Sequence, residues 1–289
     1  MDTQSNTQTA QSAQTNQTKH NKTFSLSSLS DYRTEIYGAS ILWIMIFHAY
    51  LCGVVWPKPL EWINIGNMGV EIFLFLSGTG LYYSFSKDKD IAGFYKRRVL
   101  RIFIPILVIC TPYWIRMYMI GEASLSNLVL KYLTLDFWVS GRQQIWFISL
   151  IVVCYVFYPF IYHILFGKEE DGCRKPWFRE IFMCLLLVCI LGEVEKAFPL
   201  FYKATEIGLT RIPVFILGCA MGKCVFDKKE ISRGWIPVLL ALMIFTCWLI
   251  LSGQVHGTLK RYTYIFGGIP ITLLLGYIFY RFDLGPLKT

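Results

Sequence analysis

The chain is built from blocks of about 20 apolar residues, and this feature constrains its fold more than any other. A helix of about 20 residues spans the ~30 Å hydrocarbon core of a bilayer, where only helices and closed barrels satisfy their backbone polar groups. Of the 289 residues, 55% are hydrophobic and only 16% are charged, and the mean hydropathy is +0.47. A soluble domain of this size could not cover so much apolar surface. The sequence therefore predicts an all-α fold, a polytopic transmembrane helical bundle.

Eight of these blocks are candidate membrane spans. They are expected over residues 36–56, 66–85, 99–120, 144–166, 178–194, 208–225, 235–252 and 262–280. The fifth is the weakest, because it is short and ends at Glu193 and Glu195. The amphipathic stretch 124–139 is expected to lie at the membrane interface.

The net charge of +9 is explained by membrane topology and predicts no nucleic-acid partner. With the N-terminus inside, 19 of the 28 Lys and Arg residues fall in cytoplasmic segments. This asymmetry follows the positive-inside rule and predicts a multi-pass protein of a cell membrane, bacterial inner or plasma, with its N-terminus in the cytoplasm and lipids as neighbours. Nine cysteines lie mostly in apolar segments without a Cys-x-x-Cys pair, so we expect no metal site.

Two regions of different composition divide the chain. Residues 1–23 are rich in Gln, Asn, Thr and Ser, and we expect residues 1–30 to form a disordered polar tail. The remainder, residues 31–289, is expected to be one integral membrane domain.

His48 is the first candidate for chemistry, because it lies within the first apolar block. An ionisable side chain in a membrane segment is costly and by default marks a functional site, and histidine exchanges protons near neutral pH. The alternative is a neutral imidazole that is hydrogen-bonded to a neighbouring helix. Position alone favours neither interpretation.

Glu71 is the second candidate, near the outer end of the second block. If the first two helices are adjacent and antiparallel, Glu71 and His48 reach similar depth, and the carboxylate could orient the imidazole or raise its basicity. The alternative is an interfacial glutamate that reaches water.

Arginines gather at the predicted cytoplasmic start of the third block. Arg98 and Arg101 share a helix face, and Arg97 is adjacent. Guanidinium groups bind phosphates bidentately, so a phosphate-bearing cytoplasmic donor such as coenzyme A would suit them. Charge alone favours positive-inside anchors or contacts with anionic lipids.

Two further residues lie near predicted span ends on the outer side. Trp146 begins the fourth block and is typical of an interfacial aromatic belt. Arg211 lies at the start of the sixth block, where it would bind an anionic acceptor or extend to the interface.

These segments, taken in order, resemble the acyltransferase-3 family of integral membrane acyltransferases. The resemblance rests on the apolar run into His48, on Gly-Val-Glu-Ile-Phe-Leu-Phe-Leu-Ser-Gly at 69–78, on Arg-Arg-Val-Leu-Arg-Ile-Phe-Ile-Pro at 97–105, on Trp-Phe-Ile-Ser at 146–149 with Tyr155 and Pro159, and on Phe-Ile-Leu-Gly at 215–218. Each piece is unspecific alone, but their order covers nearly the whole chain after the tail.

The resemblance implies a function and assigns roles. The donor would be a cytoplasmic acyl-CoA, used as a substrate and not held as a permanent cofactor. The acceptor would be a hydroxyl of a cell-envelope glycan or a lipid-linked sugar, and acetyl is the expected group. His48 would be the catalytic histidine, with Glu71 in support, and Arg98 and Arg101 would serve the donor.

The chain departs from the family pattern at two points. The family commonly has an arginine eleven residues before its histidine, and this chain has Tyr37 there. Arg33 lies one turn earlier on the same face and could extend toward the site. The family also usually has about ten spans, so the resemblance implies that the last spans are missing from this sequence.

Two rival functions remain open at this stage. A transporter or membrane sensor would use the same polar interior to bind a ligand without chemistry, although the lack of an inverted repeat weighs against a transporter. A truncated and inactive acyltransferase is the other.

Overall fold

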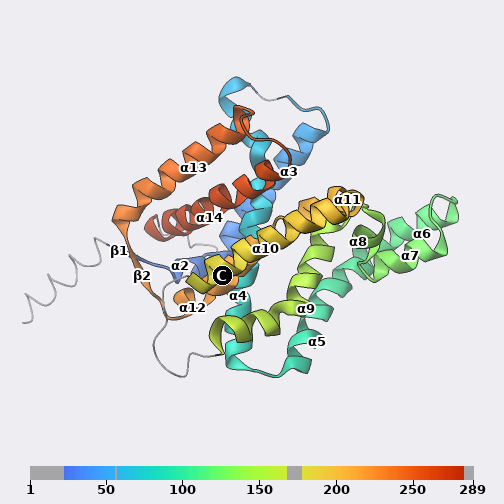
Figure 1. Ribbon diagram of the computed structural model, residues 1–289, viewed down its shortest axis with the longest axis horizontal. Helices are drawn as coiled ribbons and strands as arrows, with labels where there is room; N and C mark the ends of the chain where they lie inside the picture. Colours follow the sequence, from blue (N-terminus) through green and yellow to red (C-terminus); the bar gives the residue numbers. More distant parts are fainter. Residues whose placement is uncertain (1–22, 56, 168–177, 283–289) are drawn as a thin grey trace, which may run out of the picture. The chain divides into compact units, whose positions relative to one another are not determined.

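A computed structural model describes residues 23–55, 57–167 and 178–282 of the chain. Its elements can be followed by colour in Figure 1. In chain order they are β1 Thr23–Ser25, α2 Ser28–Asp31, α3 Arg33–Leu51, η1 Lys58–Met68, α4 Gly69–Lys87, α5 Ile91–Pro105, η2 Ile106–Cys110, α6 Thr111–Met119, α7 Leu125–Tyr132, α8 Asp136–Ser140, α9 Trp146–Phe166, α10 Phe178–Ala197, α11 Pro199–Leu209, α12 Ile212–Phe226, β2 Glu230–Ser232, η4 Arg233–Trp235, α13 Ile236–Leu251 and α14 Gly257–Arg281.

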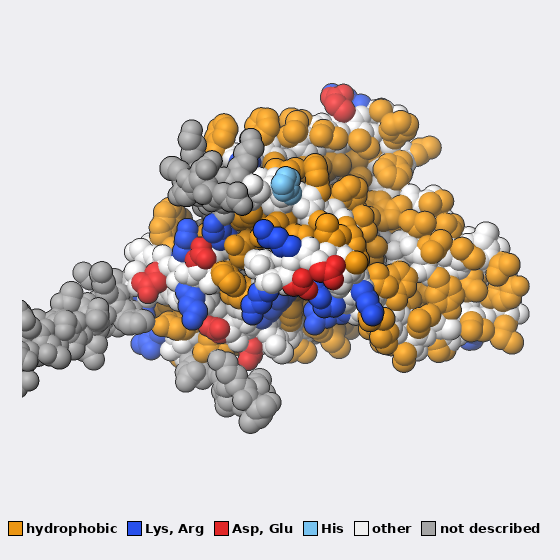
Figure 2. All heavy atoms as spheres, turned by 90° about the horizontal axis from the view of Figure 1, so that it is seen from below, with side chains coloured by type: hydrophobic (Ala, Val, Ile, Leu, Met, Phe, Trp, Pro, Cys, Tyr) orange, Lys and Arg blue, Asp and Glu red, His pale blue; other side chains and the backbone are white. Residues whose placement is uncertain are grey.

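The predicted all-α membrane fold is confirmed. Each of the eight predicted spans overlaps helix, although α3 ends at Leu51, before the predicted end of the first span. Among the described residues, six helical segments are long and apolar enough to cross a membrane. These are Arg33–Leu51, Ile91–Met119, Trp146–Phe166, Pro199–Phe226, Arg233–Leu251 and Gly257–Arg281. Large apolar side chains stay exposed along them, for example Val108 at 70% and Ile109 at 73%, as expected for surfaces that face lipid. Figure 2 shows hydrophobic side chains over much of the face that it presents.

Helix ends follow from local sequence. Asp90 caps α5, because its carboxylate accepts hydrogen bonds from the backbone N–H groups of Ala92 and Gly93 at 3.1 and 2.9 Å. Pro105 has no N–H to donate to the preceding turn, and α5 passes there into the single π-helical turn η2. The amphipathic stretch 124–139 forms the two short helices α7 and α8.

The chain divides into two compact units. Of the described residues, the first unit comprises 23–55, 57–76, 223–256 and 263–282, and the second comprises 77–167, 178–222 and 257–262. In the second unit an aromatic cluster forms the core around Tyr158, whose ring centroid lies 5.7 Å from those of Phe85 and Phe94.

Part of the predicted disordered tail is ordered in the first unit, so the prediction was wrong for residues 23–30. β1 pairs antiparallel with β2, and Phe24, Leu26 and Leu29 are buried. The ring of Phe24 packs edge-on against Tyr277 at 5.3 Å. These apolar side chains explain the order, because they bury surface that the polar residues before them lack. Residues 1–22 lie outside the described part.

Candidate functional site

His48 lies in the last turn of α3, and its side chain is exposed. Its ring contacts that of Phe47, with 5.7 Å between centroids. Within the described part of the chain the imidazole makes no hydrogen bond. The geometry therefore disfavours a histidine that is held by a neighbouring helix and leaves an imidazole that a substrate can approach.

Contacts between α3 and α4 fix the register of these helices. A Cβ on Gly69 would lie 2.9 Å from the carbonyl oxygen of Ser40, so the backbones approach closely there. Four residues on, the ring of Phe73 stacks on Tyr37 at 4.7 Å. The helices are thus antiparallel, and Glu71 lies at about the level of Ser40. At 1.5 Å per residue, that level is ~12 Å along α3 from His48.

The predicted similar depth of His48 and Glu71 was therefore wrong. The sequence prediction started the second helix at residue 66, near the outer end of α3. In the structure, η1 first returns along α3, where a Cβ on Gly66 would lie 2.5 Å from the carbonyl oxygen of Trp43. Only then does α4 begin, at Gly69. The intervening segment places Glu71 about two turns below the histidine.

Glu71 is fully buried, with 0% of its surface exposed. The alternative of an interfacial glutamate that reaches water was therefore also wrong. Its neighbour on α14 is Gly268, where an added Cβ would lie only 2.5 Å from the Cβ of Glu71. A carboxyl group in the interior of a membrane bundle is expensive to bury and by default functional.

Arg33 and Tyr37 form a polar pair near the other end of α3. The Nη2 and Nε atoms of Arg33 donate to the hydroxyl of Tyr37 at 3.0 and 3.3 Å, and Nη2 also donates to the Leu76 carbonyl at 2.9 Å. The guanidinium carbon lies 5.3 Å from the Tyr37 ring centroid. Arg33 therefore extends along this face as far as Tyr37, which lies eleven residues before His48, and its predicted role at the site stays a prediction.

An apolar cavity of about 710 Å³ opens along α3 in the first unit. Its walls come from α3, η1, α4, α13 and α14, and they include Ala39, Trp43 and Ile46 of α3. Ile46 is two residues before His48, so the cavity extends along the helix that carries the histidine.

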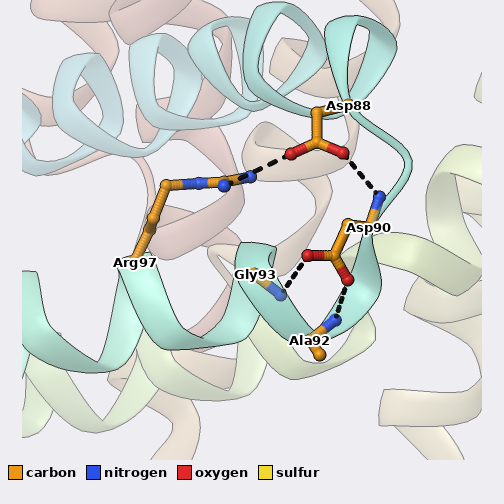
Figure 3. A network of polar contacts seen from close by, with 5 residues as sticks. All are labelled: Asp88, Asp90, Ala92, Gly93 and Arg97. Atoms are coloured by element: carbon orange, nitrogen blue, oxygen red, sulfur yellow. Dashed lines mark hydrogen bonds and ion pairs between the residues drawn. The ribbon is translucent and has the colours of Figure 1, made fainter.

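The three arginines of α5 in the second unit occupy different surroundings. Arg97 forms an ion pair with Asp88 at 3.4 Å, and both side chains are about half exposed. Figure 3 shows that Asp88 also accepts from the backbone N–H of Asp90, at 3.0 Å. Because exposed ion pairs contribute little stability, this network fixes the α4–α5 loop mainly through its cap and its backbone bond.

Arg98 and Arg101 do not face one common site in the structure. The Arg98 guanidinium carbon lies 5.4 Å from the ring centroid of Phe94 and 5.5 Å from that of Tyr155. Arg101 is exposed and borders a separate cleft of about 360 Å³, whose wall includes Phe147. Arg98 is therefore held by aromatic faces, whereas Arg101 remains accessible.

Trp146 contacts an arginine, an arrangement that the belt interpretation does not include. The Arg211 guanidinium carbon lies 5.0 Å above its ring centroid, and Arg211 is fully buried with 0% exposure. Its Nη1 donates to the Ile207 carbonyl at 2.6 Å. Arg211 therefore does not extend to the interface, and the pair is internal to the second unit.

Comparison with known proteins now defines the class. The helices and the exposed histidine describe a polytopic membrane protein with an ionisable group at the end of a spanning helix. A family model described as an acyltransferase domain, that of the acyltransferase-3 family, matches residues 38–284. The chain belongs to the acyltransferase-3 family, so the suspected resemblance is confirmed. No curated protein and no solved structure matched the chain.

Sequence reasoning missed one group of residues, at the predicted cytoplasmic end of the second unit. Lys89, Tyr162 and His163 line a pocket of about 570 Å³. Neither His163 nor Lys89 was singled out as a candidate in the sequence analysis. The available signal was weak, because the two residues are 74 positions apart and only the packing of α4 and α9 joins them.

Proposed function

We propose that this acyltransferase moves an acyl group, most readily acetyl, from cytoplasmic acyl-CoA to a hydroxyl of a cell-envelope glycan or a lipid-linked sugar. The observation that carries the proposal is the exposed His48 in the last turn of a spanning helix, in a chain that belongs to an acyltransferase family. An accessible imidazole at that place suits proton transfer with an acceptor hydroxyl.

His48 is the general base in this proposal. It removes the proton of the acceptor hydroxyl as the oxygen attacks the thioester carbonyl, the C–S bond then breaks, and the proton goes to the leaving thiolate. Transfer through an acyl-histidine is the second route, in which the imidazole attacks the thioester first. Glu71 lies about two turns away from His48, too far for a hydrogen bond to the imidazole. Its role in this proposal is to contribute negative charge to the interior of the helix bundle.

The donor binds through the arginines of α5. Arg101 is exposed beside a cleft and is the arginine that binds a donor phosphate directly. Arg98 is held between aromatic rings and adds positive charge to the same end of α5. Arg97 contributes least, because Asp88 already neutralises its charge. The Lys and Arg excess supports a cytoplasmic position for this end of α5.

The cavity along α3 supports a lipid-linked acceptor. Its walls are apolar side chains of membrane helices, and the surrounding solvent is hydrocarbon, so a lipid chain is the occupant of matching chemistry. A chain that lies along residues 39–46 would end at about the level of His48, but on another side of α3, because residues two positions apart on a helix do not face the same way. A free glycan makes no use of this cavity.

The test is acyl transfer by His48 variants, assayed with a lipid-linked and with a soluble acceptor in matched membranes. His48→Gln and His48→Ala are both expected to lose roughly 10²–10⁴-fold in rate, because neither side chain accepts a proton at neutral pH. His256→Gln is the matched control, since His256 is also exposed and its side chain caps no helix. Near-normal transfer by His48→Gln at equal protein level would remove the histidine from the mechanism.

A further inference from the structure

A pocket in the second unit combines aromatic and cationic side chains. It measures about 570 Å³, within the roughly 300–1,000 Å³ range of small-molecule sites. It is formed where α4 ends, where the loop to α5 passes and where α9 ends. Lys89, Tyr162 and His163 supply its polar groups, and Phe85, Pro159 and Phe166 are among its apolar walls.

Lys89 is the cation of this pocket, and its neighbours leave its charge available. Asp88 pairs with Arg97, and both carboxylate oxygens of Asp90 accept hydrogen bonds from the first turn of α5 (Figure 3). Among the described residues, Lys89 makes no ion pair of its own. Because Asp90 occupies the N–H groups at the start of α5, an anion in the pocket would depend on Lys89 for its charge partner.

Two hydrogen bonds at the end of α9 reduce the repulsion between its terminal carbonyl groups and a bound anion. Helix C-termini carry partial negative charge. Here the N–H of Gly167 donates to the His163 carbonyl at 2.7 Å, and the guanidinium of Arg179 donates to the Leu165 carbonyl. These two bonds use carbonyl groups of the last turn, and the charge of Arg179 is itself paired with the buried Glu180 at 3.8 Å, so Lys89 remains the cation of the pocket.

Aromatic rings supply the second half of the pocket. Tyr162 packs against Phe85 at 4.9 Å and against Phe166 at 5.1 Å between ring centroids, so its orientation is fixed. The His163 ring is exposed and lies over Gly167, where an added Cβ would be 2.8 Å from its Nδ1. A flat heterocycle stacks well on such preorganised rings.

We infer that this pocket binds the nucleotide end of the acyl donor, its adenine against Tyr162 and His163 and its phosphate against Lys89. The inference rests on the proposed function, which supplies a donor that carries a nucleotide. A lipid phosphate shares the charge chemistry, but it has no ring to match the aromatic wall. The combination of one cation and two ring faces therefore favours a nucleotide.

The experiment measures binding of adenosine 3′,5′-bisphosphate, and of inorganic phosphate, to the whole chain in phosphatidylcholine nanodiscs. We expect the nucleotide to bind more tightly than phosphate. Lys89→Gln should weaken the binding of both probes by about tenfold, and Lys89→Arg should restore it. His163→Leu should weaken the nucleotide by about tenfold and leave phosphate unchanged. Lys203→Gln, which removes an exposed charge outside the pocket, should bind both probes as the wild type does.

Three outcomes would overturn the inference. In the first, the Lys89 and His163 variants bind the nucleotide as tightly as the wild type does. In the second, the nucleotide and phosphate bind with equal affinity. In the third, the nucleotide is displaced when phosphatidylglycerol replaces phosphatidylcholine. Binding requires no turnover, so it separates this inference from the proposed function. A chain that binds the nucleotide as expected but transfers no acyl group retains this site and loses the proposed function. A chain that transfers the acyl group while its pocket variants bind normally loses only the site.

Discussion

Replacing Gly268 by alanine tests whether the buried carboxyl group of Glu71 serves the reaction. The new Cβ would lie 2.5 Å from the Cβ of Glu71. Neither atom is the end of a flexible side chain, so the contact cannot be relieved by rotation about a side-chain bond. Gly268 also supplies the carbonyl that accepts the Thr272 hydroxyl at 2.7 Å, which ties this turn of α14 together.

The size of the effect follows from that distance. Carbon atoms in van der Waals contact lie about 3.5–4.0 Å apart, so α4 and α14 must separate by about 1 Å at Glu71. Overpacking of this kind typically costs about 1–3 kcal/mol of stability. A misplacement of 1 Å can cost on the order of 10²-fold in rate even when the mutation lies far from the reacting atoms. We expect the rate of transfer per folded molecule to fall about 100-fold.

The assay compares Gly268→Ala with a variant that strains α14 elsewhere. At Gly276 an added Cβ would lie 2.7 Å from Cδ2 of Leu29, which is the end of a flexible side chain. Gly276→Ala should therefore lose some thermal stability and keep its rate. Transfer is measured in matched membranes, and the amount of folded protein is measured by size-exclusion chromatography. Glu71→Gln, which keeps the shape and removes the charge, should be as slow as Gly268→Ala.

Equal rates per folded molecule for Gly268→Ala, Gly276→Ala and wild type would refute this reasoning. Glu71 would then be a packing residue whose carboxyl group is tolerated. A slow Gly268→Ala with a normal Glu71→Gln would show that spacing of the helices matters and that the charge does not.

Two further predictions concern the arginines. The double variant Arg98→Lys with Arg101→Lys should raise the apparent dissociation constant for acetyl-CoA about tenfold, because lysine keeps the charge and loses the bidentate fork. An unchanged donor titration would return the pair to the role of topology anchors. Tyr37→Phe removes the hydroxyl that accepts from Arg33 and should lower transfer about tenfold, whereas Tyr118→Phe, at an exposed position, should not. Equal rates for both phenylalanine variants would show that the Arg33–Tyr37 bond is dispensable.

The existence of the helices was predictable, because an apolar segment long enough to cross a membrane must form a helix there. The case of α4 shows where hydropathy fails as a guide. Its Ser, Gly, Thr and Tyr residues lower its hydropathy, and it is not among the six segments that meet the membrane criterion. Nevertheless most of α4 is buried, because small and polar residues face neighbouring helices and not lipid. High hydropathy identifies helices that face lipid, whereas α4 is largely enclosed by other helices and has little lipid-facing surface.

Long-range pairing could not be predicted. The strand Thr23–Ser25 reads as the end of a polar tail, and its partner Glu230–Ser232 follows more than 200 positions later. Three residues carry too little pattern to indicate a strand. The order of this segment comes from Phe24 and Leu29, which pack in the first unit.

The sequence identified which residues are candidates for the site, but it did not predict which of them lie close together. His48 and Glu71 are ionisable groups in apolar blocks, which is visible in any sequence. Their separation depends on η1, whose return along α3 involves a close approach at Gly66. The pocket at Lys89 and His163 likewise depends on how two helices end, and neither residue is unusual in its own segment.

The register of α3 and α4 also bears on the arginine that this chain lacks eleven residues before His48. Tyr37 occupies that position, and its hydroxyl accepts two hydrogen bonds from Arg33, one turn closer to the start of the helix. The guanidinium group is therefore displaced and not lost. The Leu76 carbonyl accepts a third bond from it, which holds the charge against the neighbouring helix, well short of His48. A contribution of Arg33 to the reaction is therefore expected to act through Tyr37, whose hydroxyl accepts from the cation and whose ring stacks on Phe73.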